Sequence, residues 1–194
     1  MLSPRFFKKC YLELVTLIDN CKKKDNKAYE ILYKKYYRVL YSIALRYART
    51  SFEAEDILQD SFVKIFKSIS SYQMEGSFEG WLKRIVQNTA INSYKSNLKF
   101  NNNINVADEG QEVMDDNFTA IFETFETKDV LTLLNNLPDG YRIIINFYCI
   151  EGYTHKEIAE MLNISIGTSK SQLFKAKEYL KKVIEKQLLI QQSK

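Results

Sequence analysis

The sequence predicts an all-α protein in which a flexible acidic linker joins two small helical domains. Three observations lead to this fold class. The chain has only 6 glycines and 2 prolines among 194 residues, whereas sheet proteins need more of both at their turns. Apolar residues recur at three- and four-residue steps in both halves of the chain, which indicates amphipathic helices. A polar stretch without helical period separates these two parts.

The first domain is expected over residues 22–97, after an N-terminal extension over 1–21 that carries a helix of its own. Three further helices follow the extension, and each has a side chain that can cap its first turn. The expected caps are Asp25, Ser51 and Ser77. The apolar stripes behind them predict a bundle with one buried face per helix.

The linker is expected over residues 98–129 because charge and composition both change there. Residues 108–129 hold eight acidic side chains and one lysine, a net charge of −7. Residues 1–107 carry +8 and residues 130–194 carry +3. A short helix is expected over 118–125. The linker is interpreted as a solvated tether, and the alternative is a nucleic-acid mimic that occupies a basic channel.

The second domain is expected over residues 130–188, followed by a tail over 189–194. Its helices run over 130–137, ending at Pro138, and over 141–150, ending near Gly152. Thr154 and Glu157 then form a capping box, and Ser165 can cap the last helix. This spacing is typical of a helix-turn-helix that binds DNA. The alternative is an ordinary helical hairpin with a solvated face.

Two features of the first domain suggest macromolecular partners. Asp56, Asp60 and Lys64 lie at i, i+4 and i+8, a polar stripe that can bind a basic helix, although the helix dipole also explains this order of charges. Aromatic Phe78 and Trp81 lie among basic and amide side chains, as in surfaces that stack single-stranded bases. The alternative is that both rings are core residues.

Several function classes have no support in the sequence. Cys10, Cys21 and Cys149 form no CxxC pair, and His155 is the single histidine, so a metal site, a disulfide framework and a cofactor are not expected. No apolar run is long enough for a membrane span, and the N-terminus does not resemble a signal peptide. A cytoplasmic protein without a small-molecule substrate is expected.

The motifs of both domains, in this order, resemble an extracytoplasmic-function (ECF) sigma factor of the sigma-70 family. Residues 54–66, AEDILQDSFVKIF, resemble region 2.2, which binds core RNA polymerase. Residues 78–90, FEGWLKRIVQNTA, resemble regions 2.3 and 2.4, which recognise and melt the −10 element. Residues 137–142 and 151–173 resemble region 4, which binds the −35 element. The resemblance covers about 22–97 and 130–186.

The resemblance implies three sets of binding residues and no catalytic or metal-binding ones. For polymerase they are Asp56, Gln59, Asp60, Val63 and Lys64. For the −10 element they are Tyr72, Gln73, Met74, Phe78, Trp81, Arg84, Asn88, Asn92 and Lys95. For the −35 element they are His155, Thr168, Lys170, Ser171, Gln172 and Lys175. Tyr72 and Gln73 are expected to be loop residues that can be replaced without opening a cavity.

The implied partners are core RNA polymerase and promoter DNA, with an anti-sigma factor as a further candidate and a monomer as the free form. The chain departs from the family pattern at Ser169, where valine is frequent, and at Asn92 and Lys95, where Asp and Arg are frequent. A helix-turn-helix regulator that acts without polymerase would explain residues 130–194 equally well, but not 54–66 and 78–90. A helical DNA glycosylase is a third class, but its glycine-rich turn is missing.

Overall fold

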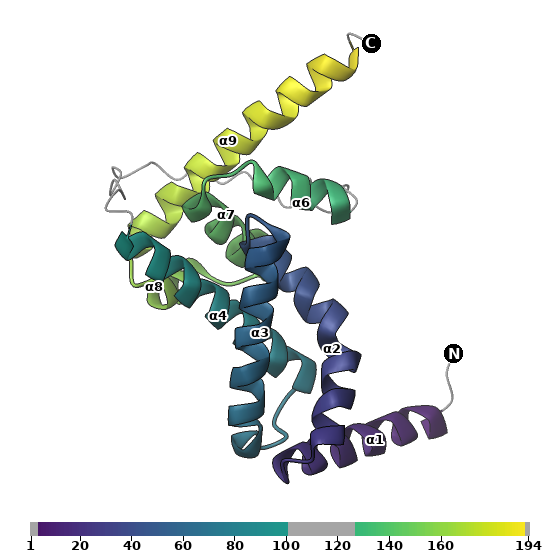
Figure 1. The fold of residues 1–194 in the computed structure, drawn as a ribbon. Coiled ribbons are helices and arrows are strands. Elements are labelled where there is room, and N and C mark those ends of the chain that lie inside the picture. Colours follow the sequence, from purple (N-terminus) through teal and green to yellow (C-terminus); the bar gives the residue numbers. More distant parts are fainter. Residues whose placement is uncertain (1–3, 101–126, 193–194) are drawn as a thin grey trace. The chain divides into compact units, whose positions relative to one another are not determined.

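The computed structural model describes residues 4–100 and 127–192, and every regular element in those ranges is helical (Figure 1). The fold therefore confirms the all-α prediction. Most of the acidic linker, with the helix expected over 118–125, lies outside the described residues. The described chain forms two compact units: Met1–Ala44 with Thr50–Ala90, and Leu45–Arg49 with Ile91–Lys194.

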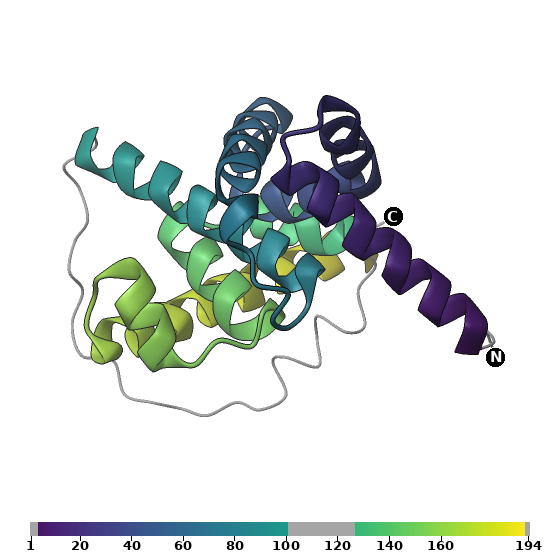
Figure 2. The ribbon, with the colours of Figure 1, turned by 90° about the horizontal axis from the view of Figure 1, so that it is seen from below.

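The first half of the chain contains four long helices and one 3-10 turn. They are α1 (Pro4–Lys22), α2 (Asn26–Tyr47), α3 (Ser51–Ser68), the 3-10 turn η1 (Ile69–Ser71) and α4 (Phe78–Phe100). Helices α2 and α3 run side by side in both ribbon views (Figures 1 and 2). Aromatic rings join them, with centroids 4.3 Å apart for Tyr29 and Phe66 and 4.6 Å apart for Tyr33 and Phe62.

The caps of the first unit follow the sequence prediction at two of three positions. Asp25 Oδ1 accepts the backbone N–H of Lys27 at 2.9 Å, and Ser77 Oγ accepts that of Gly80 at 3.2 Å. The prediction for α3 was wrong by one residue, because Thr50 is the N-cap and its Oγ1 accepts from Glu53 N at 3.1 Å. Ser51 is the first helical residue instead.

The second unit contains a helix-turn-helix preceded by two shorter helices. Its elements are α6 (Thr127–Asn135), α7 (Asp139–Ile145), the π-helical turn η2 (Asn146–Ile150), α8 (His155–Leu162) and α9 (Ile166–Gln192). Gly152 follows the π-helical turn by two residues and has a φ of +74°. Glycine adopts this left-handed conformation at little cost. The core is apolar and includes Ile144, Phe147, Ile158 and Leu180, all buried.

The units differ from the predicted domains at two places. Residues 45–49, which include the end of α2, and the part of α4 from Ile91 onward belong to the second unit rather than the first. Helical periodicity cannot predict this division, because it depends on side chains that meet across about 100 residues of sequence.

Candidate polymerase and promoter interface

Helix α3 presents an exposed ridge on the side away from its core face. Ala54, Ile57, Leu58, Phe62 and Ile65 are buried, whereas the ridge side chains are exposed. The ridge consists of Asp56, Gln59, Asp60, Val63 and Lys64. Val63 is 50% exposed, so the ridge combines two carboxylates with an unpartnered apolar side chain. Such a surface fits a partner helix that carries basic and apolar groups.

Lys64 differs from the other ridge residues because it also braces α4. Its Nζ donates to Thr89 Oγ1 at 3.1 Å, and Thr89 Oγ1 in turn donates to the carbonyl oxygen of Ile85 at 2.8 Å. Phe52, at the start of α3, is 71% exposed and extends the apolar part of this surface. Phe52 is not among the residues predicted to bind polymerase, although its position one turn before Asp56 places it on the same helix face.

The loop between η1 and α4 is anchored by an aromatic cluster of Tyr72, Phe78 and Trp81. Ring centroids are 5.1 Å apart for Tyr72 and Phe78, 5.0 Å for Tyr72 and Trp81, and 5.7 Å for Phe78 and Trp81. Tyr72 is 6% exposed and Phe78 is 4% exposed. The expectation that Tyr72 can be replaced without opening a cavity is therefore wrong. Burial raises the pKa of Tyr72, so its hydroxyl stays protonated.

Two residues of this loop remain accessible to a nucleic acid. Gln73 is exposed and Met74 is half-buried. Met74 has a φ of +61°, and Gly76 has a φ of +71°, so the chain reverses sharply over the aromatic cluster. The Tyr72 hydroxyl lies 3.4 Å from the carbonyl oxygen of Gly76, which ties the loop to its anchor.

Helix α4 carries an exposed polar stripe after the aromatic cluster. Arg84, Asn88 and Asn92 are all exposed and follow each other at four-residue spacing, so they share one helix face. Lys95 lies one residue out of this register and is half-buried. Its Nζ donates to the carbonyl oxygen of Met161 at 2.8 Å within the second unit.

The helix-turn-helix is built by local side-chain caps, as predicted. Glu157 Oε2 accepts the backbone N–H of Thr154 at 2.8 Å, and Thr154 Oγ1 accepts that of Glu157 at 3.3 Å. Asn163 ends α8 in the left-handed conformation with a φ of +57°. Ser165 Oγ accepts from Thr168 N at 2.9 Å and caps α9.

The predicted −35 residues divide by burial. Thr168, Lys170, Gln172 and Lys175 are half-buried. Ser171 was expected to contact the −35 element, but it is 2% exposed and its hydroxyl donates to the carbonyl oxygen of Thr168 at 3.1 Å.

The two remaining residues that bear on the −35 surface are His155 and Phe174. His155 is half-buried, stacks on Tyr148 with centroids 4.5 Å apart, and has its Nδ1 3.0 Å from Ser169 Oγ. A serine at position 169 thus provides a polar partner for this ring, where valine could not. Phe174 is 36% exposed one turn after Lys170. It is not among the predicted −35 residues, because a phenylalanine is more often a core residue than an exposed one.

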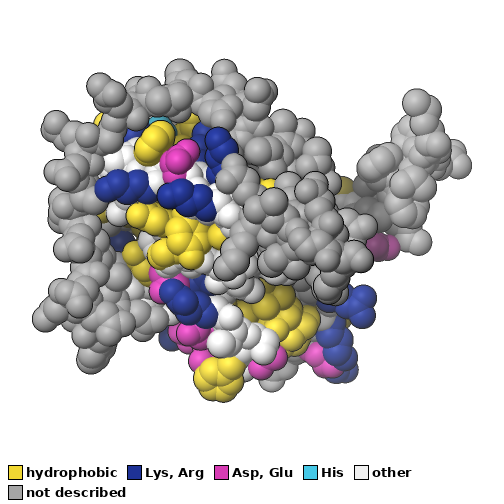
Figure 3. Space-filling view, turned by 90° about the horizontal axis from the view of Figure 1, so that it is seen from above, with side chains coloured by type: hydrophobic (Ala, Val, Ile, Leu, Met, Phe, Trp, Pro, Cys, Tyr) yellow, Lys and Arg dark blue, Asp and Glu magenta, His cyan; other side chains and the backbone are white. Residues whose placement is uncertain are grey.

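The described residues on one face of the molecule mix apolar and charged side chains. Figure 3 shows apolar side chains at the surface among Lys, Arg, Asp and Glu. Among the described residues, no helix is long and apolar enough to cross a membrane. The described residues offer an exposed ridge on α3, a loop over an aromatic cluster, and a helix-turn-helix that carries lysines.

Comparison with known proteins agrees with both halves of this architecture. The pattern of Sigma-70 region 2 matches residues 32–99, and the pattern of Sigma-70, region 4, matches residues 127–180. The chain belongs to the sigma-70 family of RNA polymerase sigma factors, in its ECF group.

Individual relatives span nearly the whole chain. The ECF RNA polymerase sigma-E factor of Haemophilus influenzae is 28% identical over 178 residues, which cover 87% of this chain and 94% of the relative. The RNA polymerase sigma-H factor of Pseudomonas aeruginosa is 23% identical over 178 residues, covering 87% and 92%. The fold is similar to that of the sigma factor RpoE of Bartonella quintana, solved with the anti-sigma factor NepR. That similarity has a TM-score of 0.50 at 18% identity and covers 82% of this chain and 98% of that one.

Proposed function

We propose that this chain binds core RNA polymerase through the α3 ridge and directs it to promoters through the α4 stripe, the loop and the helix-turn-helix. It makes and breaks no covalent bond in this role, so we propose that it is not an enzyme. Its proposed place is the cytoplasm, together with polymerase and DNA, and an anti-sigma factor is a proposed further partner.

The observation that carries this proposal is the exposed α3 ridge. A DNA-binding regulator that acts alone needs only the helix-turn-helix, whereas Asp56, Asp60 and Val63 form a surface without a partner in the described chain. Exposed carboxylates beside an apolar side chain give a partner both charge complementarity and buried area.

We propose that the −10 element is captured at the η1–α4 loop. Gln73 and Met74 are accessible there, and the buried Tyr72 holds the loop in place. An extruded base costs a few kcal/mol to unstack, and stacking on an aromatic side chain returns about 1–3 kcal/mol per base. Half-buried Trp81 is the aromatic ring that a base can reach. Arg84, Asn88 and Asn92 are the proposed contacts along the strand.

We propose that the −35 element is bound by the first turns of α9. Lys170 and Lys175 are suited to phosphates, since ammonium groups act as point charges. Gln172 is the proposed base contact, and Phe174 can contact a thymine methyl group. Ser171 is not a proposed contact, because it is buried.

The decisive experiment is charge reversal on the ridge. Asp56→Lys with Asp60→Lys should weaken binding to core polymerase at least tenfold and abolish promoter-specific transcription. Glu13→Lys with Asp19→Lys is the matched control, because both residues are exposed carboxylates on α1 and the change in charge is the same. Far-UV circular dichroism should be unchanged in both variants.

The result also separates the alternatives. If the wild-type chain binds −35 duplexes but never joins core polymerase, it is a regulator that acts alone. If the ridge variant and the α1 control bind polymerase equally well, the ridge is not the polymerase-binding surface.

A further inference from the structure

The imidazole ring of His155 lies where three elements of the second unit meet. His155 is the first residue of α8, and its ring stacks on Tyr148 of η2 with centroids 4.5 Å apart and an angle of 24° between the planes. Its Nδ1 lies 3.0 Å from the Oγ of Ser169 on α9. Both rings are half-buried, whereas Ser169 is fully buried. The stack fixes the plane of the imidazole, and the serine fixes its rotation within that plane.

The tyrosine under this ring is held in place by the backbone around it. Glu151 donates its N–H to the carbonyl oxygen of Asn146 at 2.9 Å, and Tyr153 donates to that of Phe147 at 2.9 Å. Phe147 is fully buried, and its ring lies 5.5 Å from that of Tyr153. These contacts tie η2 to the segment that leads into α8, so Tyr148 forms a fixed support for the first residue of that helix.

The burial of Ser169 determines the direction of its hydrogen bond to His155. A neutral imidazole carries one N–H and one bare nitrogen, so either group could be the donor in this pair. A buried hydroxyl whose proton lacks an acceptor is costly, and Nδ1 is the hydrogen-bond partner of this hydroxyl within the described chain. Ser169 therefore donates to the bare Nδ1 of His155, and the ring carries its proton on Nε2.

A phosphate is the ligand that suits an N–H group at this place. In a helix-turn-helix, the first helix crosses the DNA backbone while the second enters the major groove. Ser169 directly precedes Lys170, the proposed phosphate contact on α9, so His155 lies next to the first turns of that helix. A phosphate oxygen accepts hydrogen bonds and carries negative charge, which strengthens its bond to a neutral N–H.

We propose that Ser169 is a positioning residue that directs the Nε2–H of His155 at a phosphate of the −35 duplex. This inference rests on the proposed function, because it requires the helix-turn-helix to bind that duplex. Ser169 differs here from the valine that is frequent in the family. A valine fills the same space but donates no hydrogen bond, so it leaves both the proton position and the rotation of the ring unfixed.

The test compares two variants that have the same shape at position 169. The probe is a −35 duplex that the wild-type full chain selects from a random-sequence library, and binding is measured at pH 8, where a free imidazole is neutral. Ser169→Thr keeps the hydroxyl and should bind within about twofold of wild type, whereas Ser169→Val should bind about fivefold more weakly. Ser169→Ala repeats the comparison without a branched side chain, and the Tm of each variant reports on folding.

A double-mutant cycle shows whether the serine acts through the histidine. His155→Phe keeps a ring on Tyr148 but has no N–H, and should weaken binding about tenfold. Adding Ser169→Val to His155→Phe should cause no further loss, since the positioned group is already absent. An equal loss from Ser169→Val in both backgrounds, or equal affinities of the Thr and Val variants, would overturn the positioning role.

A methylphosphonate scan of the same duplex identifies the ligand. Each probe carries one neutral linkage in place of a phosphate, and the loss caused by His155→Phe should disappear at one position of the scan. If His155→Phe binds more weakly than wild type by the same factor on every probe, the ring does not contact a phosphate and the proposal fails. If the wild-type chain selects no duplex from the library, the proposed function fails instead.

Discussion

Replacing Tyr72 separates the packing role of the loop between η1 and α4 from its proposed role in promoter melting. The ring is 6% exposed and contacts Phe78 and Trp81 at centroid distances of 5.1 and 5.0 Å. Removal of a buried aromatic ring costs about 3–5 kcal/mol. In a small domain, 1 kcal/mol corresponds to about 4–8 °C in Tm. Tyr72→Ala should therefore lower the Tm by about 12 °C or more.

The assay uses the fluorescence of Trp81, because it is the single tryptophan of the chain and lies in the cluster itself. Tyr72→Phe keeps the ring contacts and loses only the long contact of its hydroxyl with the carbonyl oxygen of Gly76, so its Tm should stay within a few degrees of wild type. A Tyr72→Ala protein with the wild-type Tm would refute the packing argument.

Gln73 provides the complementary half of this prediction. Its side chain is exposed, and surface substitutions usually change stability by less than about 0.5 kcal/mol. Gln73→Ala should keep its Tm and its binding to a −35 duplex, yet reduce the permanganate reactivity of unpaired thymines at the −10 element. A promoter mismatched across that element should recover part of the loss. Normal opening of the fully paired promoter would assign the loop a purely structural role.

Three further predictions concern the second unit. Lys170→Ala should weaken binding to all −35 duplexes alike and reduce the slope of log affinity against log salt concentration by about one. Gln172→Ala should instead cost about 1–3 kcal/mol of discrimination at one base pair. Fluorescence anisotropy measures both effects. Thr154→Ala should remove half of the capping box and cost about 1 kcal/mol, seen as a lower Tm that Thr154→Ser largely restores. Burial raises the pKa of the Cys149 thiol from 9.0 to about 11. Because the thiolate is the reactive form, alkylation at pH 8 should be about 100-fold slower in the folded chain than in urea. Equal rates would contradict the raised pKa of this half-buried thiol.

Local sequence determined the helices, most of their caps and the order of the motifs. Asp25, Ser77, Thr154 and Ser165 act within three residues of their own positions, so their hydrogen bonds depend on local spacing alone. The exposed positions of the α3 ridge follow from the same logic, because burial of one face of a helix leaves the opposite face in solvent.

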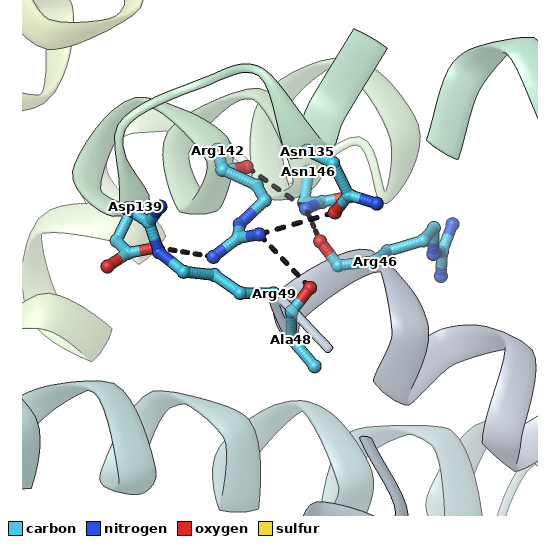
Figure 4. A network of polar contacts seen from close by, with 7 residues as sticks. All are labelled: Arg46, Ala48, Arg49, Asn135, Asp139, Arg142 and Asn146. Carbon is cyan, nitrogen blue, oxygen red and sulfur yellow. Dashed lines mark hydrogen bonds and ion pairs between the residues drawn. The ribbon is translucent and has the colours of Figure 1, made fainter. Parts of the chain in front are cut away.

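Tertiary structure alone decided which polar side chains are free to bind a partner. Tyr72 and Ser171 lie at positions where local pattern predicts exposure, and both are buried because distant or neighbouring groups cover them. Arginine is usually a surface residue, yet the guanidinium of Arg142 is buried at the end of α2. It donates there to the carbonyl oxygen of Ala48, 94 residues earlier in the chain (Figure 4). Periodicity reports the direction of a side chain from its own helix, whereas burial depends on what other elements place there.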